Sequence, residues 1–163
     1  MTAPLEADVG RLLGRKSLTL ATAESCTGGL LGAAVTSVPG SSSWYLGGII
    51  AYANAVKMRH LGVRASVLRV HGAVSEPVAR QMAGGVRSRL GSDFAIGITG
   101  VAGPAGGTGA KPVGLVWIAL AGPGGCVAAE RRFRGGREAV RRQAVRQALS
   151  MLRDALTGGA PGE

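Results

Sequence analysis

The chain has 163 residues, a mass of 16.4 kDa and a formal net charge of +10, and 46% of its residues are hydrophobic. This length fits one globular domain over residues 1–163, and the hydrophobic content excludes a disordered tail or a solvated linker. No apolar run is long enough to cross a membrane, and the early acidic residues are unlike a secretory signal. We therefore expect a cytoplasmic domain without a membrane partner.

Predicted strands and helices alternate along the chain. The spacing of apolar residues predicts the helices, and short β-prone or apolar runs predict the strands. In chain order, the predicted elements are a helix at 5–15, a strand at 17–22, a helix at 30–38, a buried strand at 44–52, a short helix ended by Gly62, a helix through Leu90 opened by Ser75 and Pro77, two central strands at 93–99 and 112–121, a strand at 126–134 and a helix at 137–156.

This alternation predicts the fold class. Strands separated by helices are typical of an α/β fold, here a single three-layer α/β/α domain with a central, mostly parallel or mixed sheet. Ser75 is a candidate N-cap for the helix that follows it. The tail from about residue 157 is expected to be a frayed end.

The charge of the chain is unevenly distributed. The chain contains nineteen lysines and arginines but nine acidic residues, and eight of the arginines lie in the segment from Arg131 to Arg153. Such an excess favours an anionic partner, either a nucleic acid or a phosphorylated small molecule. A solvated helix face would show the same pattern, and composition does not choose between these interpretations.

The first candidate for chemistry is the segment TAESCTGG, in which Ser25 lies between a strand and a helix. Backbone amides at such a place can hold a phosphate or stabilise an oxyanion, and Gly28 and Gly29 would let a ligand come close. The alternative is that Ser25 and Thr27 only cap the helix. Cys26 is a rival nucleophile at the same position.

The second candidate is the segment AYANAVK, which places Lys57 five residues after Tyr52. Its apolar neighbours, Val56 and Met58, could desolvate the lysine, which would lower its pKa and make it a general base for a serine. An ordinary surface lysine is the alternative.

Two further features are less specific. The glycine-rich loop GVAGPAGGTGAK is not a P-loop, but its amides could line an anionic pocket. His60 and His71 have no partner at ligand spacing, and Cys26 and Cys126 alone do not make a metal site. We expect no metal and no cofactor.

Six blocks in the chain carry a family resemblance. They are TAESCTGG, GSSSWYLGGIIAYANAVK, HGAVSEPVARQMAGG, GITGVAGPAGGT, KPVGLVWIAL and the REAVRRQA run. Together, in this order, they closely resemble the CinA C-terminal domain family, which includes bacterial nicotinamide-nucleotide amidohydrolases of the PncC type. The length leaves no room for the molybdopterin-binding-like domain of some members, so we expect the stand-alone form.

The resemblance implies an amidase that converts nicotinamide mononucleotide and water to nicotinate mononucleotide and ammonia. It implies that Ser25 is the nucleophile, that Lys57 is the base and that Tyr52 orients this pair. A basic helix suits a phosphorylated substrate, and of its arginines we favour Arg141 for the phosphate. The expected substrate-binding residues are Thr27, Gly28, Gly29, Asn54, Thr99, Gly100, Gly103, Arg137 and Arg141.

The chain departs from the family pattern at Ala53, Ala55 and Ala110, where other members often carry polar or acidic residues. These changes bear on substrate affinity more than on the chemistry. The alternative function is a nucleotide- or nucleic-acid-binding regulatory module without turnover. The few aromatic residues speak against nucleic acid as the partner. A homodimer is the expected assembly.

Overall fold

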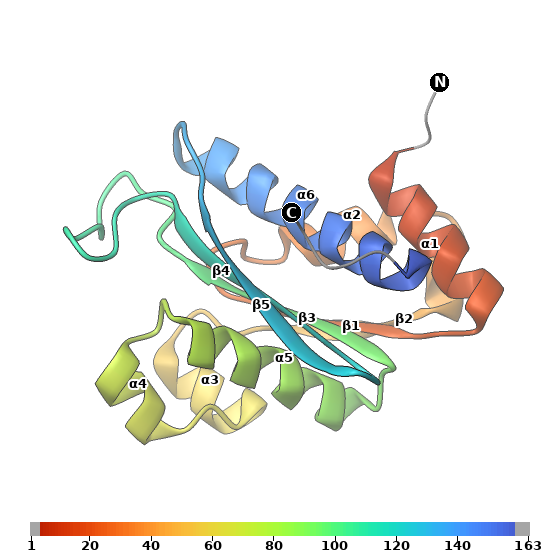
Figure 1. Ribbon diagram of the computed structural model, residues 1–163, viewed down its shortest axis with the longest axis horizontal. Coiled ribbons are helices and arrows are strands. Elements are labelled where there is room, and N and C mark those ends of the chain that lie inside the picture. Colours follow the sequence, from red (N-terminus) through yellow and green to blue (C-terminus); the bar gives the residue numbers. More distant parts are fainter. Residues whose placement is uncertain (1–3, 159–163) are drawn as a thin grey trace.

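A five-stranded sheet lies between two layers of helices in the computed structural model, which describes residues 4–158 (Figure 1). The elements are α1 (Leu5–Lys16), β1 (Leu20–Glu24), α2 (Leu30–Thr36), the 3-10 turn η1 (Ser41–Ser43), β2 (Tyr45–Ile50), α3 (Asn54–Leu61), α4 (Ala65–His71), α5 (Glu76–Leu90), β3 (Phe94–Gly100), β4 (Leu115–Gly122), β5 (Gly125–Arg132) and α6 (Arg137–Thr157).

The sheet is mixed, with the strand order β2-β1-β3-β4-β5. Strand β1 runs parallel to both β2 and β3, whereas β4 and β5 are antiparallel to their neighbours. Helices α1, α2 and α6 cover one face, and α3, α4 and α5 cover the other (Figure 1). The predicted three-layer α/β fold is therefore confirmed.

The central strands are formed by continuous apolar runs of the sequence, which are buried in the middle of the sheet. All five residues of β1 are buried, as are most residues of β3 and β4, because helices cover both faces of the sheet there. The buried strands predicted at 93–99 and 112–121 are thus confirmed. Small residues let the helices approach closely: a Cβ atom added to Gly85 of α5 would lie 1.8 Å from the carbonyl oxygen of Leu61.

The prediction of a buried strand at 44–52 is wrong in one respect. Strand β2 forms there, but it is an edge strand and its side chains are alternately half-buried and exposed. Leu46 is 46% exposed and Ile50 is 55% exposed. An apolar run looks the same in a central strand and at an edge, because strand order is decided by tertiary packing.

Three smaller differences concern helices. Helix α4 was not predicted. Ser75 precedes α5 as predicted, but its hydroxyl donates to the carbonyl of Gly72 (2.9 Å) and does not cap the helix. Helix α6 continues to Thr157, and the remainder of the expected frayed tail, 159–163, lies outside the described residues. Within residues 4–158 no helix has the length and apolar character that crossing a membrane requires.

Candidate active site

The candidate site lies where β1, β2 and β3 end, because the carboxyl ends of parallel strands meet at one edge of a sheet. The first turn of α6 and the loop after β3 complete a cavity of about 300 Å³. Seven predicted site residues line this cavity: Ser25, Tyr52, Asn54, Lys57, Thr99, Gly100 and Arg137. Residues that are up to 112 positions apart in the sequence are thus brought together.

Ser25 follows directly after the last residue of β1 and is buried. Its amide donates to the carbonyl of Ile98 in β3 (2.9 Å), so the β1–β3 pairing continues into the loop and fixes the backbone of the serine. Its Oγ atom lies 2.9 Å from Nζ of Lys57. The hydroxyl is therefore turned toward the lysine, and the alternative of a helix cap is wrong for Ser25.

Lys57 is 1% exposed, so the alternative of an ordinary surface lysine is wrong. Helix α3 places it beneath the end of β2, where Nζ lies 2.7 Å from the carbonyl oxygen of Ala51 and 3.0 Å from that of Tyr52. All three partners of the amine are oxygens of neutral groups. Burial lowers the pKa of Lys57 below its usual 10.5, because the charged form loses its hydration.

Cys26 lines the same cavity but differs from Ser25 in its surroundings. Burial raises the pKa of its thiol to about 11, so the thiolate is scarce at neutral pH. No base lies within hydrogen-bonding distance of its sulfur in the described part of the chain. The environment favours Ser25 over Cys26 as the nucleophile.

Tyr52 and Arg137 meet at the mouth of the cavity. The Nη2 group of Arg137 donates to the hydroxyl of Tyr52 (3.0 Å), and its Nη1 group donates to the carbonyl of Gly103 (2.8 Å). Tyr52 itself is 60% exposed. A guanidinium that is held in place from two sides is thus available to an anionic group that enters here.

Arg141 is placed differently from Arg137. It does not line the cavity; it donates to the carbonyl of Thr27 (2.8 Å) and pairs with Glu138 (2.9 Å). Thr27, Gly28, Gly29 and Gly103 also lie outside the lining. The hydroxyl of Thr27 is buried without a partner among residues 4–158, so the alternative of a helix cap is wrong for Thr27 too.

Sequence reasoning missed Glu24, the last residue of β1. Its carboxylate accepts hydrogen bonds from the amides of Gly29 (3.1 Å), Leu31 (3.0 Å) and Gly32 (2.9 Å). The start of α2 is thus capped by Glu24 and not by a hydroxyl. An acidic residue four positions before a diglycine was the available signal, but its partners depend on the path of the loop.

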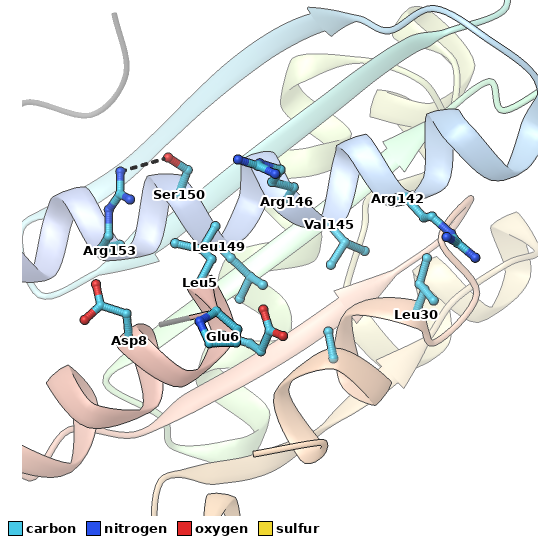
Figure 2. A pocket seen from close by; sticks show the side chains of 12 residues that line it. Leu5, Glu6, Asp8, Leu30, Arg142, Val145, Arg146, Leu149, Ser150 and Arg153 are labelled. Atoms are coloured by element: carbon cyan, nitrogen blue, oxygen red, sulfur yellow. Dashed lines mark hydrogen bonds between the residues drawn. The ribbon is translucent and has the colours of Figure 1, made fainter. Parts of the chain in front are cut away.

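A second, larger hollow of about 870 Å³ lies between α1, α2 and α6 (Figure 2). Arginines of α6 and acidic residues of α1 border it, and Leu30 and Leu149 contribute to its apolar surface (Figure 2). Ser150, which lines this hollow, accepts a hydrogen bond from Nη2 of Arg153 (3.4 Å), and no base contacts its hydroxyl among residues 4–158. None of the predicted site residues lines it, so the candidate chemistry is confined to the smaller cavity.

Fold and site together define an α/β protein with a buried serine–lysine pair at the carboxyl ends of its parallel strands. The chain belongs to the CinA C-terminal domain family, whose model matches residues 2–156.

Relatives and solved structures agree with this assignment. A CinA-like protein of Synechococcus sp. (strain CC9902) is 59% identical over 151 residues, which are 91% of this chain and 36% of that protein. A CinA-like protein of Gemmatimonas aurantiaca is 56% identical over 140 residues, 86% of this chain and 33% of that protein. The chain thus spans about a third of the length of these relatives.

Solved structures resemble the chain over almost its whole length. A CinA superfamily protein of Klebsiella pneumoniae superposes with a TM-score of 0.91 at 40% identity, covering 94% of this chain and 96% of that one. The competence/damage inducible protein CihA of Agrobacterium tumefaciens gives a TM-score of 0.88 at 39% identity, covering 96% and 98%.

Proposed function

We propose that the chain is an amidohydrolase that converts nicotinamide mononucleotide and water to nicotinate mononucleotide and ammonia. The observation that carries the proposal is the contact of 2.9 Å between Ser25 Oγ and Lys57 Nζ in a cavity that also holds Arg137. A serine activated by a buried lysine is a known arrangement for acyl transfer. Membership of the CinA family supports the proposal.

The two carbonyl partners of Lys57 suit it to act as a base. A neutral amine has two N–H groups and one lone pair. The carbonyl oxygens of Ala51 and Tyr52 accept the two N–H groups, at 2.7 Å and 3.0 Å, so the lone pair faces Ser25. In this state the serine hydroxyl donates to Nζ, which is the geometry that proton transfer requires.

The reaction follows in two halves. Ser25 Oγ attacks the carboxamide carbon while its proton passes to Lys57. The tetrahedral intermediate then expels ammonia, which takes that proton from Lys57, and leaves an ester on Ser25. In the second half, water attacks the ester as Lys57 accepts one of its protons; the proton returns to Oγ and nicotinate mononucleotide leaves.

Arg137 and Tyr52 supply the other polar groups of the cavity. The guanidinium at the mouth would bind the phosphate of the nucleotide while the nicotinamide ring lies toward Ser25. Tyr52 would hold Arg137 through its hydroxyl and Lys57 through its carbonyl. The residues that depart from the family pattern, Ala53, Ala55 and Ala110, are exposed and do not line the cavity.

The test is ammonia release from nicotinamide mononucleotide by the wild type and by S25A. We expect S25A to lose at least roughly a thousandfold in rate, the scale for removal of a nucleophile. S150A is the matched control, because Ser150 lines the other hollow and has no base. A chelator is expected to change nothing. Turnover by S25A would overturn the serine mechanism, and a wild type that binds nucleotides or DNA without releasing ammonia would favour the regulatory alternative.

A further inference from the structure

The carboxylate of Glu24, the last residue of β1, forms hydrogen bonds with the end of the loop that carries Ser25 and with the start of α2. Glu24 is 2% exposed, and its side chain turns away from the candidate cavity, which it does not line. Its Oε2 atom accepts the amides of Gly29 and Leu31, and its Oε1 atom accepts the amide of Gly32. The side chain of the residue before Ser25 is thus bonded to backbone four to seven residues after Ser25.

A carboxylate this deeply buried is costly unless hydrogen bonds compensate its charge. Here three backbone donors converge on it, and bonds of this kind, with an ionised acceptor, are stronger than neutral ones. The amides of Gly29, Leu31 and Gly32 are therefore not available to a ligand. The three bonds tie the end of the loop 25–29 and the start of α2 to the end of β1.

The backbone of Glu24 connects the same loop to Lys57. The amide of Ala51 donates to the carbonyl of Glu24 (2.8 Å), and the carbonyl of Ala51 accepts Lys57 Nζ (2.7 Å). Ser25 is covalently next to Glu24. One residue thus fixes the position of the nucleophile on one side and, through Ala51, of the base on the other.

We propose that Glu24 is a positioning residue, which sets the distance between Ser25 Oγ and Lys57 Nζ by holding the loop 25–29 against the start of α2. The inference rests on the proposed function only in taking Ser25 as the nucleophile. Because the carboxylate does not line the cavity, Glu24 acts through Ser25 and makes no contact with substrate.

The test compares E24Q with D93N. In E24Q the side chain keeps its size, but its amide nitrogen is a donor and faces a backbone donor. Asp93 makes a similar clamp at the opposite end of β1, where Oδ2 accepts the amide and the hydroxyl of Thr19, both at 2.8 Å. Asp93 directly precedes β3, so D93N changes a carboxylate that is bonded to the backbone before β1, at the end of the sheet far from Ser25.

Two readouts separate positioning from general damage. With nicotinamide mononucleotide, E24Q should lose about 10- to 100-fold in kcat, the scale of a small misplacement of a reacting group, while KM stays within about threefold. A fluorophosphonate that labels Ser25 should react more slowly with E24Q by a similar factor. D93N, measured as folded protein, should keep the wild-type kcat and labelling rate.

E24Q that is labelled and turns over at the wild-type rate would overturn the proposal, as would an equal loss in D93N. If E24Q does not fold, E24D keeps the charge and shortens its reach by one methylene. Slower labelling of E24D supports the proposal, and wild-type labelling overturns it. A wild type that is labelled at Ser25 but releases no ammonia overturns the proposed substrate alone, because the labelling comparison still decides the role of Glu24.

Discussion

Lys57 Nζ and Ser25 Oγ lie 2.9 Å apart although 32 positions separate the two residues in the chain. Their meeting depends on the parallel pairing of β1 with β2, which places the end of one strand beside the end of the other. Ser25 follows β1 directly, and α3 turns back under the end of β2 to bring in Lys57. The pairing of the strands, and not a local sequence motif, therefore brings the two side chains to the same end of the sheet.

The pH dependence of turnover follows from the burial of Lys57. Only the neutral amine can accept a proton, so kcat/KM should rise with pH, about tenfold per unit while the protonated form dominates. Burial lowers the pKa of Lys57, so the midpoint of this rise should lie below pH 10.5. A pH–rate profile from mildly acidic to alkaline conditions checks this, with K57R as an inactive control. A flat profile would contradict a lysine base.

Replacement of Cys26 tests the choice between two adjacent nucleophiles. The raised pKa of about 11 leaves the thiol protonated and weakly nucleophilic at neutral pH. C26A should therefore keep ammonia release within about threefold of the wild type, far above S25A. Loss of turnover in a folded C26A, together with its retention in S25A, would assign the chemistry to the thiol.

Arg137 is the arginine that the geometry favours for the phosphate. R137A should raise KM for nicotinamide mononucleotide at least about tenfold more than KM for nicotinamide riboside, because a charged pair is lost only with the phosphorylated substrate. R142A on the same helix is the control, since Arg142 lines the other hollow and pairs with Glu138. Equal effects on both substrates would remove Arg137 from the phosphate site.

Arg141, favoured from the sequence, should behave differently. Its guanidinium donates to the carbonyl of Thr27, in the loop after Ser25. R141A should lower kcat with nicotinamide mononucleotide and with the riboside by a similar factor, about 3- to 30-fold, as the loop loses that donor. Steady-state kinetics with both substrates check this. A KM effect confined to the phosphorylated substrate would restore the original assignment.

Two neighbouring glycines of α5 should respond to alanine in opposite directions. A Cβ at Gly85 would lie 1.8 Å from the carbonyl oxygen of Leu61, whereas a Cβ at Gly84 would meet nothing within 4 Å. Urea unfolding should therefore show G85A destabilised by about 1–3 kcal/mol, the cost of overpacking. G84A should be stabilised by roughly 0.5–1 kcal/mol, because alanine favours the helix. Equal effects would mean that α5 does not approach α3 so closely.

Much of the scaffold could be predicted from the sequence, because long apolar runs and helical spacing survive in any context. The strand at 93–99 and the helix at 137–156 correspond to β3 and α6 for this reason. The place of β2 at the edge of the sheet could not be predicted, since strand order is a tertiary property. Helix α4 has only seven residues, too few to show a clear helical repeat of apolar residues.

The residue types of the candidate site could be predicted from the sequence, but the hydrogen bonds that hold the surrounding loop in place could not. Ser25 follows a predicted strand, at a place where functional groups often lie, and Lys57 lies in the short helix predicted after the next strand. The role proposed for Glu24 depends on a loop that brings three backbone amides to one carboxylate. The spacing of residues in the sequence does not predict the path of that loop. The engagement of Arg141 with Thr27, 114 positions away, is equally invisible before folding.

The turn of the hairpin formed by β4 and β5 lies at the end of the sheet that is remote from the candidate active site. Gly122 pairs with Gly125 at the turn, whereas Val116 lies beside Gly100 near the cavity. Six residues of strand, about 20 Å, separate the two ends. The turn at Pro123 and Gly124 is exposed, so it is a suitable place to insert a fluorophore tag or an affinity peptide, from which the protein could be immobilised with its cavity left open to solvent.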